Sequence, residues 1–148
     1  MKFEHRVTVS ASKAKVQAFL DDFNRAARCV PGLQEVKEVE PNVYDGSVRV
    51  RIGPLGLTVG GRAKLDRSDP EAWRVQGEGR DRRVGASVIA NVEARFVELA
   101  ADSTELALLA DVQFTGRLAE LGQPLIKRKA DSFVQEFAEN LRKAISAA

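Results

Sequence analysis

From Leu33 to Thr115, apolar and polar residues alternate almost without interruption. Alternation with a period of two is typical of strands that bury one face, and turn-forming residues divide this stretch into segments. The segments predict six strands, which cover roughly Leu33–Glu40, Asn42–Ile52, Leu57–Ser68, Ala72–Gly79, Arg83–Leu99 and Thr104–Phe114. Because the connections between them are short, successive strands are expected to pair antiparallel as a meander.

Before this stretch, the sequence predicts one further strand and two short helices. Residues Lys2–Ser10 alternate in the same way and indicate a half-buried strand. Lys13–Leu20 has apolar residues at helical spacing, with Ser10 or Ser12 as the N-cap. Asp22–Arg28 is expected to form a second short helix. Neither helix is long enough to be stable alone, so both are expected to pack against the rest of the domain.

After Thr115, the hydrophobic period changes from two residues to three or four. Leu118–Ile145 carries apolar residues at this spacing, which predicts one long amphipathic helix. Gly122 and Pro124 indicate an irregular first turn. At about 1.5 Å per residue, the helix from Pro124 onward spans about 30 Å, which is enough to cross a seven-stranded sheet.

These elements predict an α+β fold in one domain that covers residues 1–148. The length is typical of a single domain, and no linker, repeat or low-complexity segment divides it. A seven-stranded antiparallel sheet must bury its inner face, and the long C-terminal helix is the only predicted element of sufficient size. The sheet is therefore expected to wrap around that helix, with the two short helices between the first and second strands.

The composition excludes several classes of protein and site. The chain has one Cys and one His, so an intrachain disulfide is impossible and a Cys/His zinc site lacks ligands. A Ser-His-Asp triad would have to use His5. The net charge of +2 is far below the basic excess of most nucleic-acid-binding domains. No apolar run would span a membrane and the N-terminus lacks a signal-peptide core, so a cytoplasmic location is expected.

The inner faces of the predicted strands are rich in small residues. In the strand Arg83–Leu99, the inward row alternates larger side chains with Ala: Val84, Ala86, Val88, Ala90, Val92, Ala94 and Phe96. Gly77 and Gly79 face inward from the strand before it, and Gly61 and Ala63 face inward from an earlier one. Two interpretations stay open. Either the helix packs closer at these positions, with Gly77 and Gly79 as bulges, or the space is an apolar cavity suited to a small molecule.

Four turns are expected to lie together at one end of the sheet. In an antiparallel meander alternate turns share an end, which groups Gly53–Gly56, Arg80–Arg83 and Thr115–Leu118 with Cys29–Leu33. A Gly-rich end of this kind is expected to be the mouth of a cavity, and four ordinary turns are the alternative. The same end is basic, through Arg80, Arg82, Arg83, Arg117, Lys127, Arg128 and Lys129. It would meet an anionic lipid surface or an acidic partner, or form a solvated rim.

Single residues give weaker indications. His5 is expected to be an inward-facing core residue with a satisfied hydrogen bond, in preference to a catalytic base. Cys29 is interpreted as a small buried apolar group beside the mouth, with ligand contact as the alternative. Asp81, Asp111 and Glu120 are candidate acids, but their spacing pairs no two of them.

Six short motifs, in order along nearly the whole chain, are similar to those of a known family. They are Met1–His5, Cys29–Leu33, Ile52–Leu55, Gly77–Asp81, Thr115–Gly122 and Gln135–Leu141. Each motif alone is weak, but six in register are fairly specific. Together they resemble the carbon monoxide dehydrogenase CoxG family, which belongs to the START-like, SRPBCC superfamily.

The resemblance implies a helix-grip fold with a hydrophobic cavity. It also implies a non-catalytic accessory role, in which the protein recruits a molybdenum hydroxylase of the carbon monoxide dehydrogenase type to the membrane and binds a quinone that takes its electrons. No catalytic residue carries over. The cavity-mouth motifs of the family correspond here to Cys29, Pro31, Gly32, Gly53, Pro54, Leu55, Gly79, Asp81, Thr115, Gly116 and Arg117. Many members continue into a membrane-binding tail, whereas this chain ends at Ala148, so transient contact at the inner face of the membrane is expected.

The leading hypothesis is a binding module for a quinone or lipid-like ligand, with no metal, no covalently bound cofactor and no nucleic-acid partner. The predicted cavity walls are Trp73, Val75, Ala86, Val88, Ala90, Leu108, Phe114, Leu121, Leu125 and Phe133. Two alternatives stay open. A small-molecule enzyme of the cyclase or hydrolase kind would need titratable groups aimed into the cavity. A ligand-free assembly chaperone would have a filled core and an apolar or charged outer patch.

Overall fold

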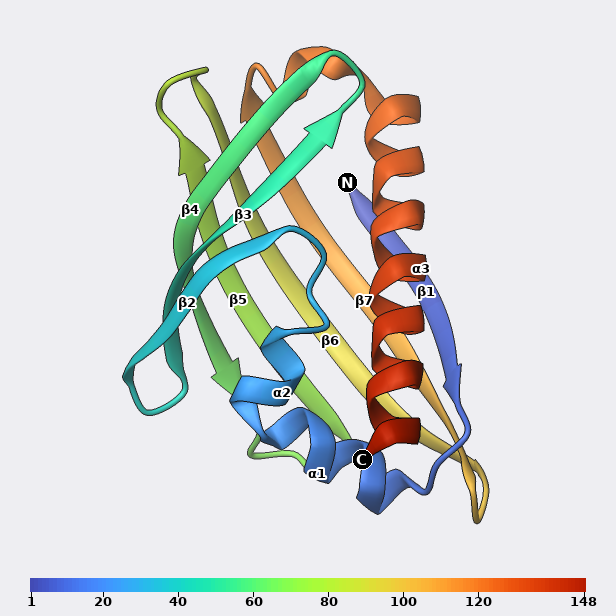
Figure 1. Ribbon diagram of the computed structural model, residues 1–148. Helices are drawn as coiled ribbons and strands as arrows, with labels where there is room; N and C mark the ends of the chain where they lie inside the picture. Colours follow the sequence, from blue (N-terminus) through green and yellow to red (C-terminus); the bar gives the residue numbers. More distant parts are fainter.

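The computed structural model describes residues 1–148 as one antiparallel sheet, three α-helices and one 3₁₀ turn. In chain order the elements are β1 (Lys2–Val9), α1 (Lys13–Asp21), α2 (Phe23–Ala27), β2 (Leu33–Glu40), β3 (Val43–Ile52), β4 (Leu55–Asp66), β5 (Ala72–Asp81), β6 (Ala86–Ala100), β7 (Ser103–Gly116), η1 (Ala119–Leu121) and α3 (Gln123–Ala147). Figure 1 shows the curved sheet around α3, with α1 and α2 across one end. The predicted architecture, a seven-stranded antiparallel sheet around a long C-terminal helix, is confirmed.

The element boundaries follow the sequence pattern closely. β2 has the predicted bounds, and the other strands differ at their ends by a few residues. Ser12, not Ser10, caps α1, because its hydroxyl accepts a hydrogen bond from the Lys15 N–H at 3.1 Å. The long helix begins at Gln123 and not at Leu118, since Gly122 adopts a φ of 87° and separates α3 from η1.

The first strand completes the sheet from the far side. The strand order is β1-β7-β6-β5-β4-β3-β2, so β1 pairs with the last strand of the chain. His5 lies opposite Leu108, and Val9 lies opposite Thr104. This pairing joins segments about one hundred residues apart. It leaves β1 and β2 as the two edges of the sheet.

Three paired glycines mark the line along which the sheet curls. Gly46 of β3 lies opposite Gly61 of β4, which lies opposite Gly79 of β5. A Cβ atom on Gly61 would collide with the Glu78 carbonyl oxygen and lie 2.7 Å from the Gly79 Cα, so only glycine permits this approach. The pairing of β5 with both neighbours is continuous. The interpretation of Gly77 and Gly79 as bulges is therefore wrong, because the sheet bends here without an extra residue.

The buried apolar side chains form two separate clusters on the inner face. The larger consists of Val7, Val9, Ala11, Val16, Phe19, Cys29, Phe96, Leu106, Ala138, Leu141 and Ile145. The smaller consists of Ile52, Leu57, Ala86 and Leu118. α3 joins both, since Leu125 packs against the smaller cluster and Leu141 is fully buried in the larger. Each such buried leucine stabilises the fold by about 1.5–3 kcal/mol relative to an exposed one.

Candidate apolar cavity

An apolar hollow of about 300 Å³ lies on the inner face of the sheet. All of its lining residues come from β2 to β6. Those on the inward rows are Leu33, Val36, Tyr44, Gly46, Val48, Val59, Gly61, Ala63, Gly77, Gly79, Val88 and Ala90. Nearly all are small or apolar, as is usual for a pocket that binds an apolar molecule. Ser47, Arg62 and Glu78 complete the lining from outward positions of the same strands.

The cavity exists because the inner face lacks large side chains where the sheet bends. Gly61 and Gly77 carry no side chain, and Ala63 and Ala90 carry only a methyl group. On either side of this region the inward rows return to larger residues, such as Val59 of β4 and Trp73 of β5, which pack against the two clusters. The gap between the clusters is thus set by side-chain size.

Two of the ten predicted wall residues, Val88 and Ala90, line this cavity. Trp73 and Leu108 pack against the larger cluster, while Val88, Phe114, Leu121 and Leu125 pack against the smaller one, which contains Ala86. Val75 lies half-buried on β5, two residues from Gly77. Phe133 belongs to neither cluster and lies half-buried on α3, midway in sequence between Leu125 and Leu141. That all ten touch a ligand stays a prediction.

Three of the four predicted mouth turns meet at one end of the sheet. Gly53, with a φ of 58°, lies so close to α3 that a Cβ atom there would be 2.7 Å from Leu125 Cδ2. The Arg117 N–H donates to the Gly85 carbonyl at 3.0 Å, and Gly116 has a φ of 66°. These contacts bring the β3–β4, β5–β6 and β7–α3 connections together, beside the exposed Pro54 and the half-buried Leu55. Their role as a mouth stays a prediction.

The fourth turn lies elsewhere, so the predicted position of Cys29 at that end is wrong. Cys29 is only 2% exposed in the larger cluster, and its carbonyl accepts a hydrogen bond from Asn140 Nδ2 at 3.1 Å. Burial also raises the pKa of the Cys29 thiol. The next residues run along the edge of β3, where the Arg49 N–H donates to the Gly32 carbonyl at 2.8 Å and Pro31 is buried.

The register of β2 explains this displacement. Its first residue, Leu33, lies opposite Val48, so β2 starts four residues short of the end of β3 at Ile52. The rule that alternate turns share an end applies to strands of matched length joined by hairpins. β2 is entered from a helix instead, and nothing requires its start to reach the end of the sheet.

Asp81 and Gly79 occupy different environments, although they are two residues apart. Gly79 lines the cavity. Asp81 is 6% exposed and holds the β5–β6 turn against β4, because it accepts hydrogen bonds from the Thr58 N–H at 2.9 Å and the Arg83 N–H at 3.0 Å. The Thr58 hydrogen bond, followed by the Arg83 guanidinium, holds the pKa of the Asp81 carboxyl below its usual range. This carboxylate therefore stabilises a turn and has no free lone pairs aimed at the cavity.

His5 is a satisfied inward-facing residue, as its place in the sequence indicates. Its Nε2 lies 2.8 Å from Asp131 Oδ1 of α3, and its side chain is 19% exposed. The other two candidate acids are exposed. Glu120 pairs with Arg117 at 3.4 Å, and Asp111 lies opposite Lys2 and Asn91 on the outer face. No pair of carboxylates is brought together.

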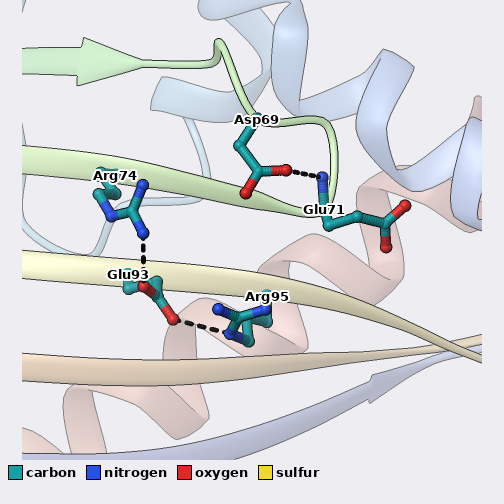
Figure 2. A network of polar contacts seen from close by, with 5 residues as sticks. All are labelled: Asp69, Glu71, Arg74, Glu93 and Arg95. Carbon is teal, nitrogen blue, oxygen red and sulfur yellow. Dashed lines mark hydrogen bonds and ion pairs between the residues drawn. The ribbon is translucent and has the colours of Figure 1, made fainter.

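The outer face of the sheet is polar and carries many ion pairs. Glu93 accepts hydrogen bonds from Arg74 Nη2 at 3.1 Å and Arg95 Nε at 2.8 Å, and nearby the Asp69 carboxylate accepts one from the Glu71 N–H (Figure 2). Two hollows on this face, of about 640 and 730 Å³, are larger than the inner cavity but are lined mainly by charged and polar residues. Their character does not suit an apolar ligand.

The basic residues collect at the end where the three turns meet. Arg80, Arg82, Lys127 and Arg128 are exposed and form no ion pair. Arg83 pairs with Asp81, and Arg117 pairs with Glu120, so two acidic groups offset part of the charge. No helix of the chain combines the length and the apolar character needed to cross a bilayer.

Sequence reasoning missed the contribution of β2 and β3 to the cavity. Val36, Tyr44, Gly46 and Val48 all line it. One signal was present, because a glycine in the middle of a strand, as at Gly46, often marks a close approach of another backbone. The sequence pattern offered no reason to connect Gly46 with Gly61.

The family model for carbon monoxide dehydrogenase CoxG matches residues 6–146 of the chain. Among curated proteins, none matches the chain in sequence.

Solved structures share the fold at low sequence identity. A conserved protein from Geobacillus kaustophilus superposes with a TM-score of 0.91 at 15% identity, over 99% of this chain and 96% of that one. A START superfamily protein from Mycobacterium smegmatis gives 0.74 at 15% identity, over 99% and 97%. The Zhui aromatase/cyclase from Streptomyces sp. R1128 gives 0.62 at 20% identity, over 98% and 90%. The expected START-like helix-grip fold is thereby confirmed.

Proposed function

Because the chain belongs to the carbon monoxide dehydrogenase CoxG family, we propose that it is a non-catalytic accessory protein that holds an apolar ligand against the inner face of its sheet. The ligand class is a quinone or a lipid-like molecule, held without a covalent bond. The partner is a molybdenum hydroxylase of the carbon monoxide dehydrogenase type, whose electrons the bound quinone accepts. The place of action is the cytoplasmic surface of the membrane.

The observation that carries this proposal is the apolar cavity between the two core clusters. A packed core leaves few voids larger than a water molecule, whereas this one leaves about 300 Å³ between Val36, Val59 and Val88. That volume is at the lower end of the range of small-molecule pockets. Burial of an apolar ligand there would be driven by about 25 cal/mol for each Å² removed from water.

An enzyme of the cyclase kind is the second candidate, since one structural neighbour is an aromatase/cyclase. Catalysis by general acids and bases needs titratable groups within hydrogen-bond reach of the substrate. The inward-facing His5 is engaged by Asp131, and Asp81 is engaged by backbone N–H groups. The inward rows of the cavity are otherwise nearly all apolar, which favours binding over catalysis. An unfilled core likewise argues against a ligand-free chaperone.

The basic end supports a transient contact with an anionic membrane surface. Each exposed Lys or Arg near such a surface contributes about 1 kcal/mol of attraction at physiological salt. Arg82, Lys127 and Arg128 lie at the end where the three turns meet. A ligand taken from a membrane would then have a short path into the protein.

Native mass spectrometry of the purified protein, followed by solvent extraction, tests the carrier function. The expected result is a stoichiometric quinone or lipid, or uptake of an added naphthoquinone by the ligand-free protein at a ratio of one. A ligand-free mass, with no uptake of added naphthoquinone or fatty acid, would contradict the proposal.

A further inference from the structure

We infer that Tyr44 is the polar anchor of the cavity, and that its hydroxyl donates a hydrogen bond to an oxygen atom of the bound ligand. This inference rests on the proposed function and deepens it. It narrows the ligand class to an apolar body that carries a carbonyl or hydroxyl oxygen near the Tyr44 end of the cavity.

Tyr44 is the one inward-facing polar side chain of the cavity lining. It lies on β3 opposite Ala63, which is on the inward row of β4, and both residues line the cavity. The other polar residues of the lining occupy outward positions of their strands. Among them, Arg62 turns away from the cavity to form an ion pair with Asp45, with its Nε 2.7 Å from Asp45 Oδ1.

The aromatic ring of Tyr44 is held in place from the side of the helices. It stacks on Phe23 of α2, with ring centroids 4.2 Å apart and an angle of 18° between the planes. The residue is 6% exposed. A stacked and buried ring loses little further freedom when a ligand binds, so the hydroxyl acts as a preorganised donor.

The Tyr44 hydroxyl has no hydrogen-bond partner within the protein. Arg67 Nε is the single side-chain nitrogen or oxygen that is both sealed from solvent and without a hydrogen bond. The Tyr44 oxygen is therefore still accessible, although the residue as a whole is buried. For packing alone, phenylalanine would fill the same space without a polar group that must be desolvated. A buried tyrosine with a free hydroxyl beside an apolar cavity is what recognition of a ligand oxygen requires.

The test compares two probes in the wild-type protein and in Tyr44→Phe. The probes are 2-methyl-1,4-naphthoquinone and 2-methylnaphthalene, which share one ring system and differ in the two carbonyl oxygens. Quenching of the single tryptophan, Trp73, or calorimetry gives the dissociation constants. Tyr44→Phe should weaken binding of the quinone about two- to tenfold, the range of one net hydrogen bond, and leave the affinity for the hydrocarbon unchanged.

A second measurement reads the hydrogen bond directly. The infrared carbonyl stretch of the bound quinone should lie lower in the wild-type protein than in hexane, and it should return toward the hexane value in Tyr44→Phe. The thermal midpoint of the variant checks that it is folded. If the variant does not fold, the comparison of wild-type protein with hexane still decides the matter.

The outcomes separate the inference from the function on which it rests. If both probes bind and Tyr44→Phe changes neither affinity nor carbonyl stretch, the anchor is wrong while the carrier function stands. If the wild-type protein binds neither probe, both are wrong.

Discussion

Gly61 of β4 and Gly79 of β5 lie opposite each other so closely that a Cβ atom on Gly61 would be 2.7 Å from the Gly79 Cα. The same two residues line the apolar cavity. The bend of the sheet and the emptiness of its inner face thus have one origin, the absence of side chains along this line. Neighbouring glycines lack this constraint, since a Cβ on Gly60 or Gly77 would meet no atom closer than 3.9 or 3.7 Å, respectively.

Gly61→Ala should therefore destabilise the fold, while Gly60→Ala should not. The new methyl group on Gly61 meets backbone atoms of β5, which cannot move without disturbing the pairing, so we expect a loss of about 1–3 kcal/mol in the free energy of unfolding. Gly60→Ala has room, and a strand position gains up to about 1 kcal/mol when Gly becomes Ala. Urea denaturation of both variants measures the difference. Equal stabilities would show that the sheet does not depend on the close approach at Gly61.

Ala90→Phe should abolish ligand uptake and leave the fold intact. Ala90 lies on the cavity wall opposite Gly77, so a phenyl ring there would occupy the space of the ligand. Ile89 is 50% exposed on the other face of the same strand, and Ile89→Phe is the matched control. Native mass spectrometry with added naphthoquinone measures uptake, and circular dichroism verifies the fold. A folded Ala90→Phe variant that still takes up ligand would place the binding site elsewhere.

Asp81→Asn should lower stability at neutral pH, and its effect should fade in acid. The pKa of Asp81 is lower in the folded protein than in the unfolded chain, so its ionised form stabilises the native state above the unfolded value of about 3.9. That contribution is lost as pH falls through the lower folded pKa. Thermal midpoints of the two proteins should thus converge as the pH falls below about 4. Asp111→Asn, at an exposed carboxylate without a hydrogen bond, should show no such dependence; a constant gap for Asp81→Asn would refute the assignment.

The Cys29 thiol should react slowly with iodoacetamide in the native protein. It is 2% exposed, and burial raises its pKa, so both access and the thiolate fraction are low at about pH 8. Mass spectrometry should find rapid labelling only after unfolding in urea, and added naphthoquinone should not change the native rate. Fast native labelling that the ligand suppresses would return Cys29 to the mouth of the cavity.

Charge reversal at the basic end should weaken binding to anionic vesicles. Lys127→Glu combined with Arg128→Glu changes the local charge by four units at exposed positions of α3. The matched control reverses Arg142 and Lys143, also exposed on α3 but near its other end. Flotation with phosphatidylglycerol vesicles at about 0.1 M salt, where the Debye length is about 10 Å, should separate the two double variants. Equal losses would indicate attraction by net charge alone, without a preferred end.

Much of the fold was predictable because the relevant signals are local. The alternation in β2 to β7 and the turn residues between them depend on neighbours in the sequence, and β2 was predicted to the residue. The inward rows followed from the same alternation, which is how Val88 and Ala90 were found. The position of Cys29 was missed because it depends on where β2 joins β3, and no local pattern specifies that register.

The sequence by itself determined which residues face inward and that many of them are small, since side-chain direction in a strand follows from the two-residue repeat of the backbone. The tertiary structure decided where that smallness leaves space. Gly46, Gly61 and Gly79 come from three strands and form one line only after β3, β4 and β5 pair. Whether a small residue is covered or left open depends on what distant segments place against it, and that is settled by packing across the whole chain.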